Sequence, residues 1–192
     1  TISLISQGNG QWRMLSHSFG TQGMAALAGI TLKEESDFLM SNNALQCQRY
    51  YYKQTGLRKR ERHVDCNALP DQILSKDHKG EYRFPKREDV IDRQIVSLAI
   101  ANDLADGKQG TLEYVVVDRE RLEPQRYQVG ASETIHVPAG ETTAIKVNRI
   151  REDNNRTTST WFSPNHGWIP VRILQTEDDK EGLELRLISV KR

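Results

Sequence analysis

The chain has 192 residues, enough to bury a substantial core within one domain of ordinary size. Its 27 basic and 26 acidic residues leave a formal charge of +1, which argues against a global field that attracts nucleic acid, so any charged partner must meet a local patch. A hydrophobic share of 36% and a charged share of 28% indicate a soluble globular protein. No apolar run approaches the roughly 20 residues that a membrane-spanning helix needs.

The first half of the chain alternates between strand patterns and turn formers. Strand candidates cover residues 1–6, 11–19, 30–40, 45–53 and 58–67, followed by a pair around Ile73 and Tyr82. The segments 7–10, 54–57 and 77–80 predict tight turns, and each makes a hairpin of the strands beside it. Pro85 ends the last of these strands because proline has no N–H for a ladder. Residues 20–29 are small and flanked by glycine, which favours a loop or one helical turn.

The periodicity becomes helical over residues 88–106. Apolar residues follow one face at helical spacing, namely Val90, Ile91, Ile95, Leu98, Ala99, Ala101, Leu104 and Ala105. Asp89 is placed to cap the start, and Gly107 is a natural stop because it tolerates the left-handed conformation. An amphipathic helix among strands needs a sheet to cover its apolar stripe.

Six further strands follow the helix, over residues 112–117, 126–137, 142–151, 156–162, 168–175 and 183–190. Short turns rich in Pro, Gly, Asn and Asp separate the last of them, and such connections require antiparallel neighbours, so the last four form a meander. The sequence therefore predicts a mainly β fold in one domain, 1–192. A curved antiparallel sheet of about ten strands, as a half-barrel or open barrel, would curl around the helix.

The segment 160–173 (TWFSPNHGWIPVRI) precedes an acidic turn and the strand residues 182–187 (GLELRL). Together with residues 23–27 (GMAAL), 92–94 (DRQ) and 147–153 (VNRIRED), it resembles the exported bacterial proteins grouped as domain of unknown function 3108. These matches span nearly the whole chain.

The resemblance implies an exported protein of Gram-negative bacteria with a curved antiparallel sheet, a helix and no established activity. It therefore implies a periplasmic location. Proteins of this family usually carry a signal peptide and one more strand upstream of the segment that begins here at Thr1.

Cys47 and Cys66 are candidates for a disulfide, since exported chains live where disulfides persist. If the second hairpin turns midway between Gly56 and Leu57, residues whose numbers sum to 113 face each other, and the two cysteines do. The alternative is a pair of buried free thiols. A metal site is less favoured because two cysteines supply half of a tetrahedral set.

The second hairpin also concentrates basic and aromatic side chains. The candidate binding residues for a phosphate, lipid headgroup or polyanion are Tyr50, Tyr52, Arg58, Lys59, Arg60 and Arg62. The alternative is that these charges protect an exposed hairpin against edge pairing.

Structural roles are predicted for five other residues. Asp92 would stabilise the first turn of the helix or pair with a sheet arginine such as Arg149 or Arg172. Trp161 and Trp168 are expected to pack in the core, and Pro170 keeps its strand from being fully paired.

No histidine has metal-ligand spacing, and no nucleophile elbow occurs, so neither a metal, a cofactor nor catalysis is predicted. The leading hypothesis is a noncatalytic periplasmic or envelope protein that binds a lipid-like ligand or an envelope protein. The rival is a structural or interaction protein without a ligand pocket, and an envelope hydrolase is the third.

Overall fold

The computed structural model describes residues 1–20, 29–42, 44–57, 59–152, 155–177 and 180–191. Within these ranges the chain forms fourteen strands, the α-helix α2 (Val96–Ala105) and the short 3-10 helix η1 (Pro164–His166). The predicted mainly β fold is confirmed, with more strands than the ten expected. Most of the loop predicted over 20–29 lies outside the described residues.

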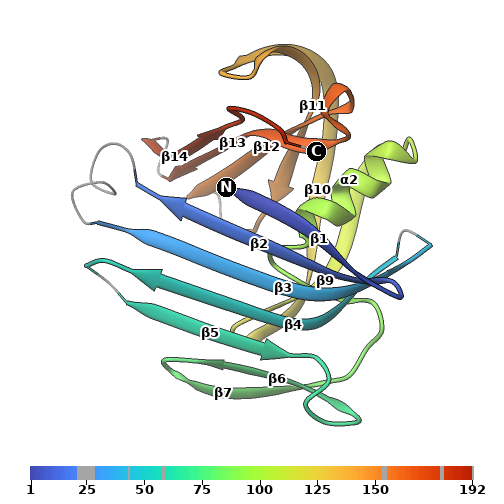
Figure 1. The fold of residues 1–192 in the computed structure, drawn as a ribbon, viewed down its shortest axis with the longest axis vertical. Helices are drawn as coiled ribbons and strands as arrows, with labels where there is room; N and C mark the ends of the chain where they lie inside the picture. The colour runs from blue at the N-terminus through green and yellow to red at the C-terminus, as the bar shows by residue number, and fades with distance from the viewer. Residues whose placement is uncertain (21–28, 43, 58, 153–154, 178–179, 192) are drawn as a thin grey trace. The chain divides into compact units, whose positions relative to one another are not determined.

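The first sheet contains β1 to β7 in chain order, each antiparallel to the next (Figure 1). Its strands are β1 (Ile2–Gly8), β2 (Gln11–Phe19), β3 (Thr31–Ser41), β4 (Ala44–Thr55), β5 (Arg60–Asp65), β6 (Gln72–Asp77) and β7 (Gly80–Pro85). The β1–β2 turn has positive φ at Asn9 (51°) and Gly10 (75°), the conformation that these two residue types adopt most readily. All three hairpins predicted in this half are present.

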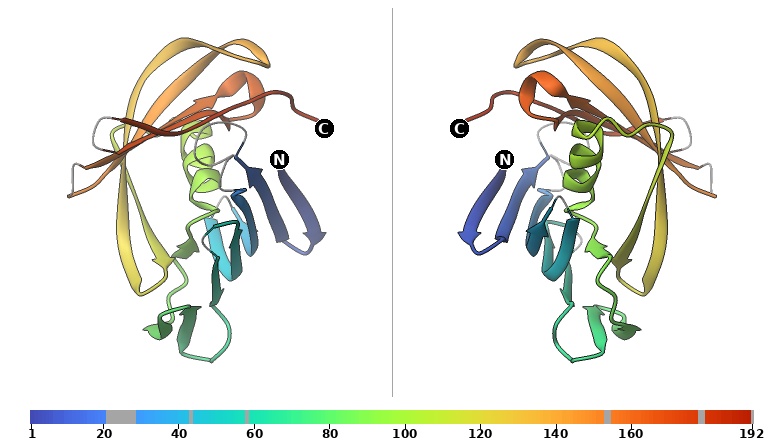
Figure 2. Two further views of the ribbon diagram at one scale, coloured as in Figure 1. Left: turned by 90° about the vertical axis from the view of Figure 1, so that its left-hand side faces the viewer. Right: turned by 90° about the vertical axis from the view of Figure 1, so that its right-hand side faces the viewer.

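The second sheet has the order β14-β13-β12-β11-β10-β9-β8. Its strands are β8 (Val90–Asp92), β9 (Thr111–Asp118), β10 (Arg121–Val137), β11 (Gly140–Ile150), β12 (Arg156–Ser163), β13 (Ile169–Glu177) and β14 (Lys180–Arg186). Strands β11 to β14 form the meander predicted for the last four strands, and β10 extends it (Figure 2). The long β10–β11 hairpin is bent along its length. Strands β8 and β9 pair in parallel, which requires a crossover connection, and α2 lies in that connection.

The helix is shorter than predicted, because the segment 88–95 is not helical. Val90 and Ile91 are β-branched and pair with β9, so a strand replaces the first predicted turn. The helix begins after Asp92, whose Oδ1 accepts the backbone N–H groups of Gln94 (2.8 Å) and Ile95 (3.2 Å). Asp89, the predicted cap, instead binds Arg87. Gly107, with φ 78°, follows the end of the helix as expected.

The contacts within the chain define two compact units. The first contains residues 1–96 and 115–123, and the second contains residues 97–114 and 124–192. The boundaries between them fall inside α2, β9 and β10.

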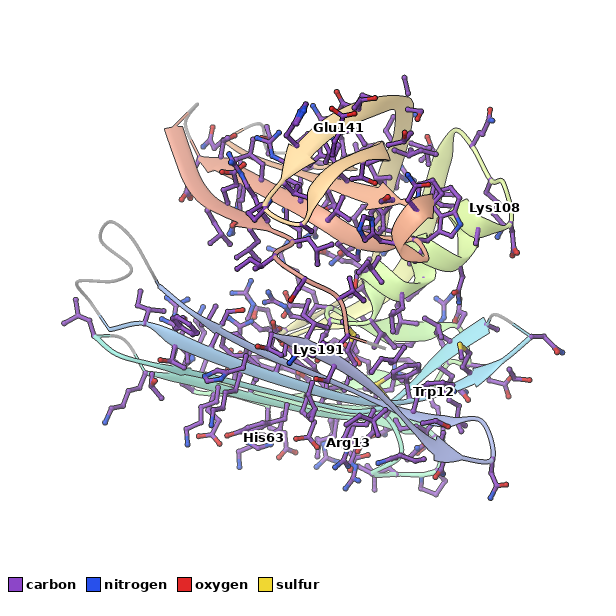
Figure 3. The ribbon with its side chains drawn as sticks, turned by 45° about the horizontal axis from the view of Figure 1, so that its top comes forward. Trp12, Arg13, His63, Lys108, Glu141 and Lys191 are labelled. Carbon is purple, nitrogen blue, oxygen red and sulfur yellow. A yellow bond between two sulfur atoms is a disulfide. The ribbon has the colours of Figure 1, made fainter. Side chains whose placement is uncertain are left out.

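The core of the first unit is built on one face of the β1–β7 sheet. Its buried members are Cys47, Tyr50, Tyr52, Val64, Cys66, Ile73, Val90 and Val117. We call the face that carries Tyr50, Tyr52 and Val64 the inner face. The opposite side, which carries Tyr51, Lys53 and His63, is the outer face; Arg13 and His63 both project from it (Figure 3).

Cys47 and Cys66 form a disulfide, with a Cα–Cα distance of 5.9 Å. The register of the β4–β5 hairpin nevertheless differs from the expected one. Tyr50 faces Val64, a sum of 114, so Cys66 lies beside Gln48, whose carbonyl accepts its N–H at 2.9 Å. A bulge in β4 at Gln48 turns Cys47 onto the inner face, where it reaches Cys66 diagonally. The pairing was right, but the direct opposition was wrong.

The core of the second unit centres on Trp161, which is 4% exposed. Its indole Nε1 donates to Glu133, and its ring contacts the cations of Lys146 (5.1 Å) and Arg172 (4.6 Å). Arg172 also binds Glu184 at 2.8 Å. Trp161 and Arg172 therefore serve packing, as predicted for Trp161.

Pro170 lies at the start of β13, beyond the pairing with β14, which begins at Arg172. Pro170 faces Phe162 next to a bulge in the β12–β13 pairing, an irregular position of the kind where a residue without an N–H is tolerated. Trp168 is half-buried at the end of the η1 turn, where its N–H binds the Ser163 carbonyl at 2.8 Å.

Candidate functional site

The six predicted binding residues of the second hairpin do not form one surface. Tyr50, Tyr52 and Arg62 are buried on the inner face, with 3%, 6% and 7% exposure. Lys59 is exposed at the β4–β5 turn, and Arg60 is half-buried opposite Gln54. Arg58 lies outside the described residues. Alternation along the strands divides the predicted set between two faces.

The inner-face members form a buried polar network. The Arg62 guanidinium lies 4.6 Å from the Tyr52 ring centroid and 3.5 Å from Asp118. Burial, and then the nearby charge of Arg93, lowers the pKa of Arg62. Tyr50 donates its hydroxyl to Glu34 at 2.7 Å, and burial raises the pKa of Tyr50 well above its usual value. The polar side chains of this network therefore bind one another.

The outer face carries a feature that the hairpin prediction missed, a row of basic residues across β2, β3 and β4. His17 faces Lys33, and Lys33 faces Lys53 directly. Like charges in directly opposed positions destabilise a sheet, so this arrangement has an energetic cost in the free protein. Lys59 and Lys76 extend the basic region beside the row. We call Lys33, Lys53, Lys59 and Lys76, together with His17, the lysine row.

The lysines of this row differ from several arginines in and beside the first sheet. All four are exposed, and none forms an ion pair within the part of the chain that the structure describes. By contrast, Arg13 binds Asp37 through two bonds of 2.6 and 2.9 Å and thereby lowers the pKa of that carboxyl. Arg49, Arg83 and Arg87 are also each paired with a carboxylate. Lysines without an ion pair among the described residues therefore gather at one end of the sheet.

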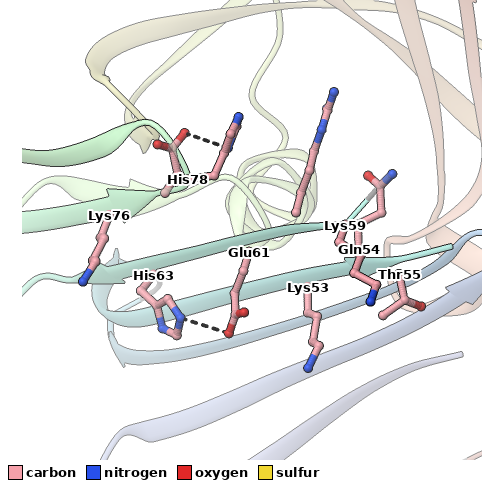
Figure 4. Close-up of a pocket in the computed structure, with 10 residues that line it drawn as sticks. Lys53, Gln54, Thr55, Lys59, Glu61, His63, Lys76 and His78 are labelled. Atoms are coloured by element: carbon pink, nitrogen blue, oxygen red, sulfur yellow. Dashed lines mark hydrogen bonds and ion pairs between the residues drawn. The ribbon is translucent and has the colours of Figure 1, made fainter. Parts of the chain in front are cut away.

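Two open depressions coincide with the lysine row. The larger, of about 760 Å³, is lined by Lys53, Gln54, Thr55, Lys59, Arg60, Glu61, His63, Lys76, Asp77 and His78. The smaller, of about 420 Å³, is lined by His17, Thr31, Lys33, Lys53 and Thr55. Lys53, Glu61, His63 and Lys76 extend from the same side of the strands (Figure 4). Because the depressions are open and their rims carry charged side chains, they suit a charged group better than a buried acyl chain.

Two acidic residues face the row in register: Glu61 faces Lys53, and Glu81, which binds Arg83, faces Lys76. Glu61 is the one that lines the larger depression. It accepts hydrogen bonds from Tyr51 (2.9 Å) and His63 (3.3 Å). The Tyr51 hydrogen bond is the main cause that lowers the pKa of Glu61, followed by that of His63, and the charge of Lys53 contributes least. The carboxylate is thus directed mainly toward Tyr51 and His63.

A serine–histidine cluster in the second unit bears on the hydrolase hypothesis. His166 Nδ1 lies 3.2 Å from Ser163 Oγ and 3.4 Å from Thr142 Oγ1. Ser163 is fully buried, and no carboxylate contacts His166 within the described ranges. The cluster consists of two buried hydroxyls around a half-buried histidine.

Asp92 is fully buried at the junction of β8 and α2. Its Oδ1 also accepts the Ser36 hydroxyl at 2.9 Å, and burial raises its pKa to about 7. The partners of Asp92 are thus a serine and two backbone amides, and not the sheet arginine offered as one alternative. Asp92 joins β3 to the start of the helix, which is a structural role.

The described residues contain no group of three or more His, Cys, Asp or Glu side chains arranged to hold a metal ion. No helix among them is long and apolar enough to cross a membrane. The disulfide is consistent with an oxidising compartment.

Comparison with solved structures supports the fold. The chain is similar to a beta-barrel-like protein of domain of unknown function DUF1849 from Brucella abortus, with a TM-score of 0.51 and 6% identity. The alignment covers 93% of this chain and 82% of that one. At this identity the likeness concerns the fold alone. No curated protein matches the chain.

The sequence match is more extensive. The model of one protein family, described as "Protein of unknown function (DUF3108)", matches residues 2–187 and so extends over both units. Because that match covers nearly every strand of both sheets, the chain belongs to the DUF3108 family.

Proposed function

We propose that the protein is a noncatalytic periplasmic or cell-envelope protein that binds lipid-like ligands through their anionic phosphate headgroups. The observation that supports this proposal is the lysine row, in which Lys33 and Lys53 oppose each other and neither forms an ion pair within the described residues. A bound phosphate placed between two opposed lysines would replace their repulsion by two charge-assisted hydrogen bonds.

The envelope location is supported by the family resemblance of the sequence and by the Cys47–Cys66 disulfide. The form of the surface supports headgroup recognition. Both depressions are open and lined by polar side chains, so the ligand would be held by its charged end. Each lysine near an anionic lipid surface contributes about 1 kcal/mol, so three of them would contribute about 3 kcal/mol.

A titration with soluble, monomeric short-chain lipid tests this proposal. The full chain is titrated with dihexanoyl phosphatidylglycerol below its critical micelle concentration, and binding is followed by ¹H–¹⁵N NMR. We expect shifts at β2, β3 and β4, and a roughly tenfold or greater loss of affinity when Lys33, Lys53 and Lys76 are all replaced by Ser. Zwitterionic dihexanoyl phosphatidylcholine should bind much more weakly.

The matched control replaces Arg83, Arg87 and Arg126 by Ser, which removes the same charge from exposed residues that are already ion-paired. This control should bind as the parent does. Equal losses in the two variants, or no loss in the lysine variant, would overturn the proposal. Inorganic phosphate is the third titrant, and equal affinity for it would assign the row to free phosphate and refute the lipid assignment.

A further inference from the structure

Two of the most exposed large apolar side chains of the first unit lie at the same end of the sheet as the lysine row. Leu57 is 84% exposed in the β4–β5 turn, and Phe19 is 65% exposed at the end of β2. Single exposed apolar residues are common on protein surfaces. Their position beside uncompensated lysines is what calls for an explanation.

The strand register places these side chains beyond the row. Phe19 faces Thr31, and Thr31 faces Thr55, while His17, Lys33 and Lys53 lie two residues further into the sheet. Two residues along a strand correspond to about 7 Å. Because the spacing is even, Phe19 lies on the same face as His17, and the two rings meet edge-on at 6.3 Å. Leu57 follows Thr55 by two residues.

The end of the sheet therefore shows a graded pattern. Phe19 and Leu57, which we call the apolar tip, lie at this end: Phe19 is level with the hydroxyls of Thr31 and Thr55, and Leu57 is in the turn after Thr55. The lysines follow two residues further into the sheet. Proteins that lie at a membrane surface bury apolar side chains roughly 5–10 Å into the boundary between headgroups and acyl chains, while basic residues remain at headgroup level. The spacing of about 7 Å between Phe19 and the row matches that depth.

Resting on the proposed function, we propose that the apolar tip inserts into the surface of an anionic lipid bilayer and that the headgroups bound by the lysine row belong to that bilayer. The positive charge of this surface favours an anionic bilayer over a groove on another protein as the binding partner. Among the residues that line the two depressions, Glu61 is the one exposed acidic side chain beside the lysines, and its hydrogen bonds are directed to Tyr51 and His63. Apolar insertion and electrostatic attraction then act together, as peripheral binding requires.

Vesicle sedimentation with the full chain tests this inference. The vesicles contain phosphatidylglycerol and phosphatidylcholine, with pure phosphatidylcholine vesicles as the reference. We expect binding to the anionic vesicles alone, and a loss of roughly tenfold or more when Phe19 and Leu57 are both replaced by Ser. The matched control replaces Leu4 and Ile5, which are 46% and 44% exposed on β1, by Ser and should bind as the parent does.

The same variants separate this inference from the proposed function. The Phe19→Ser, Leu57→Ser protein should still bind monomeric dihexanoyl phosphatidylglycerol, because the lysine row is intact, whereas the lysine variant should lose both forms of binding. Short-chain lipid binding without vesicle binding would overturn the inference and leave the function standing. If neither lipid form binds, the proposed function itself fails.

A position-specific readout guards against indirect effects of the double substitution. A Leu57→Trp protein, compared with the parent chain, should show additional emission that shifts to the blue on anionic vesicles and is quenched by brominated acyl chains. If vesicles bind this variant and the emission of the introduced tryptophan stays unchanged, another surface lies at the membrane and the inference is overturned.

Discussion

Asp92 shows at the scale of a single residue how burial determines chemistry. Its Oδ1 accepts three hydrogen bonds, whereas Oδ2 is buried and without a hydrogen-bond partner among the described residues. Burial raises the pKa of this carboxyl to about 7, against the effect of its hydrogen bonds, and the charge of Glu34 acts in the same direction as burial. Tyr50 and Arg93 are the other titratable groups near it.

This raised pKa predicts a pH-dependent stability. Between pH 3.8 and about 7 the folded chain keeps the Asp92 proton that the unfolded chain releases, so the free energy of unfolding falls as pH rises. The loss amounts to about 4 kcal/mol and is complete above the folded pKa. Asp92→Asn keeps the amide-accepting oxygen and removes the titration.

Urea denaturation of both proteins from pH 4 to pH 8 measures this effect. The variant should gain about 4 kcal/mol relative to the parent over that range. A difference between the two proteins that does not change with pH would contradict the prediction.

Residue types alone located the basic region of the first unit but not the face that carries it. The sequence showed that residues 58–62 are basic, but Arg62 is buried beside Tyr52. Lys33, which faces Lys53, comes from β3, outside the predicted hairpin. A two-residue spacing on each strand could have found them. His17 and Phe19, Lys33 and Thr31, and Lys53 and Thr55 are each two residues apart and so share a face, and the β3–β4 pairing brings those faces together.

At the scale of elements, the β4–β5 hairpin shows how an irregularity alters a sound pattern. The turn residues predicted the hairpin and the cysteine pair, but the whole β4–β5 ladder is one residue out of the expected register, and the bulge at Gln48 in the β3–β4 pairing is what turns Cys47 onto the inner face. Bulges depend on how neighbouring strands twist together, which no short sequence segment specifies.

The disulfide in this hairpin should contribute strongly to stability. The two cysteines are 19 residues apart, and a closed loop of that size stabilises the folded state by about 3 kcal/mol in the chain-entropy account. Replacing both cysteines by Ala should lower the free energy of unfolding by that order. Reducing agent should lower the stability of the parent chain and leave that of the variant unchanged. Equal effects of reductant on both proteins would show that the bridge is not the cause.

The start of the helix was also predicted incorrectly. Helical periodicity over 88–106 was correct for residues 96–105 but not for 88–95, where Val90 and Ile91 pair with Val115 and Val116. A strand of three residues leaves almost no periodic signal, and its partner lies beyond the helix in the sequence.

At the scale of the whole molecule, the two compact units raise the question of how many domains the chain contains. Their boundaries fall within α2, β9 and β10 and not within a linker, and the family match extends over both. Continuous elements that run through a boundary couple the stability of the parts they connect. The single domain predicted from the sequence therefore remains our expectation.

Calorimetry tests this expectation. A single transition with equal calorimetric and van't Hoff enthalpies is expected, both with and without the disulfide. Two separate transitions, of which reduction shifts one, would show that the units unfold independently.

The sequence by itself determined the mainly β class, most hairpins, the single described α-helix, the cysteine pair and the family, because turn chemistry, periodicity and motif order are local properties. The tertiary structure decided which face each strand residue occupies, the parallel β8–β9 pair and the grouping of unpaired lysines beside Phe19 and Leu57. The physical reason is that a sheet alternates its side chains between two faces. A shift of one residue moves a charge from solvent to core, and pairing between distant segments sets that register.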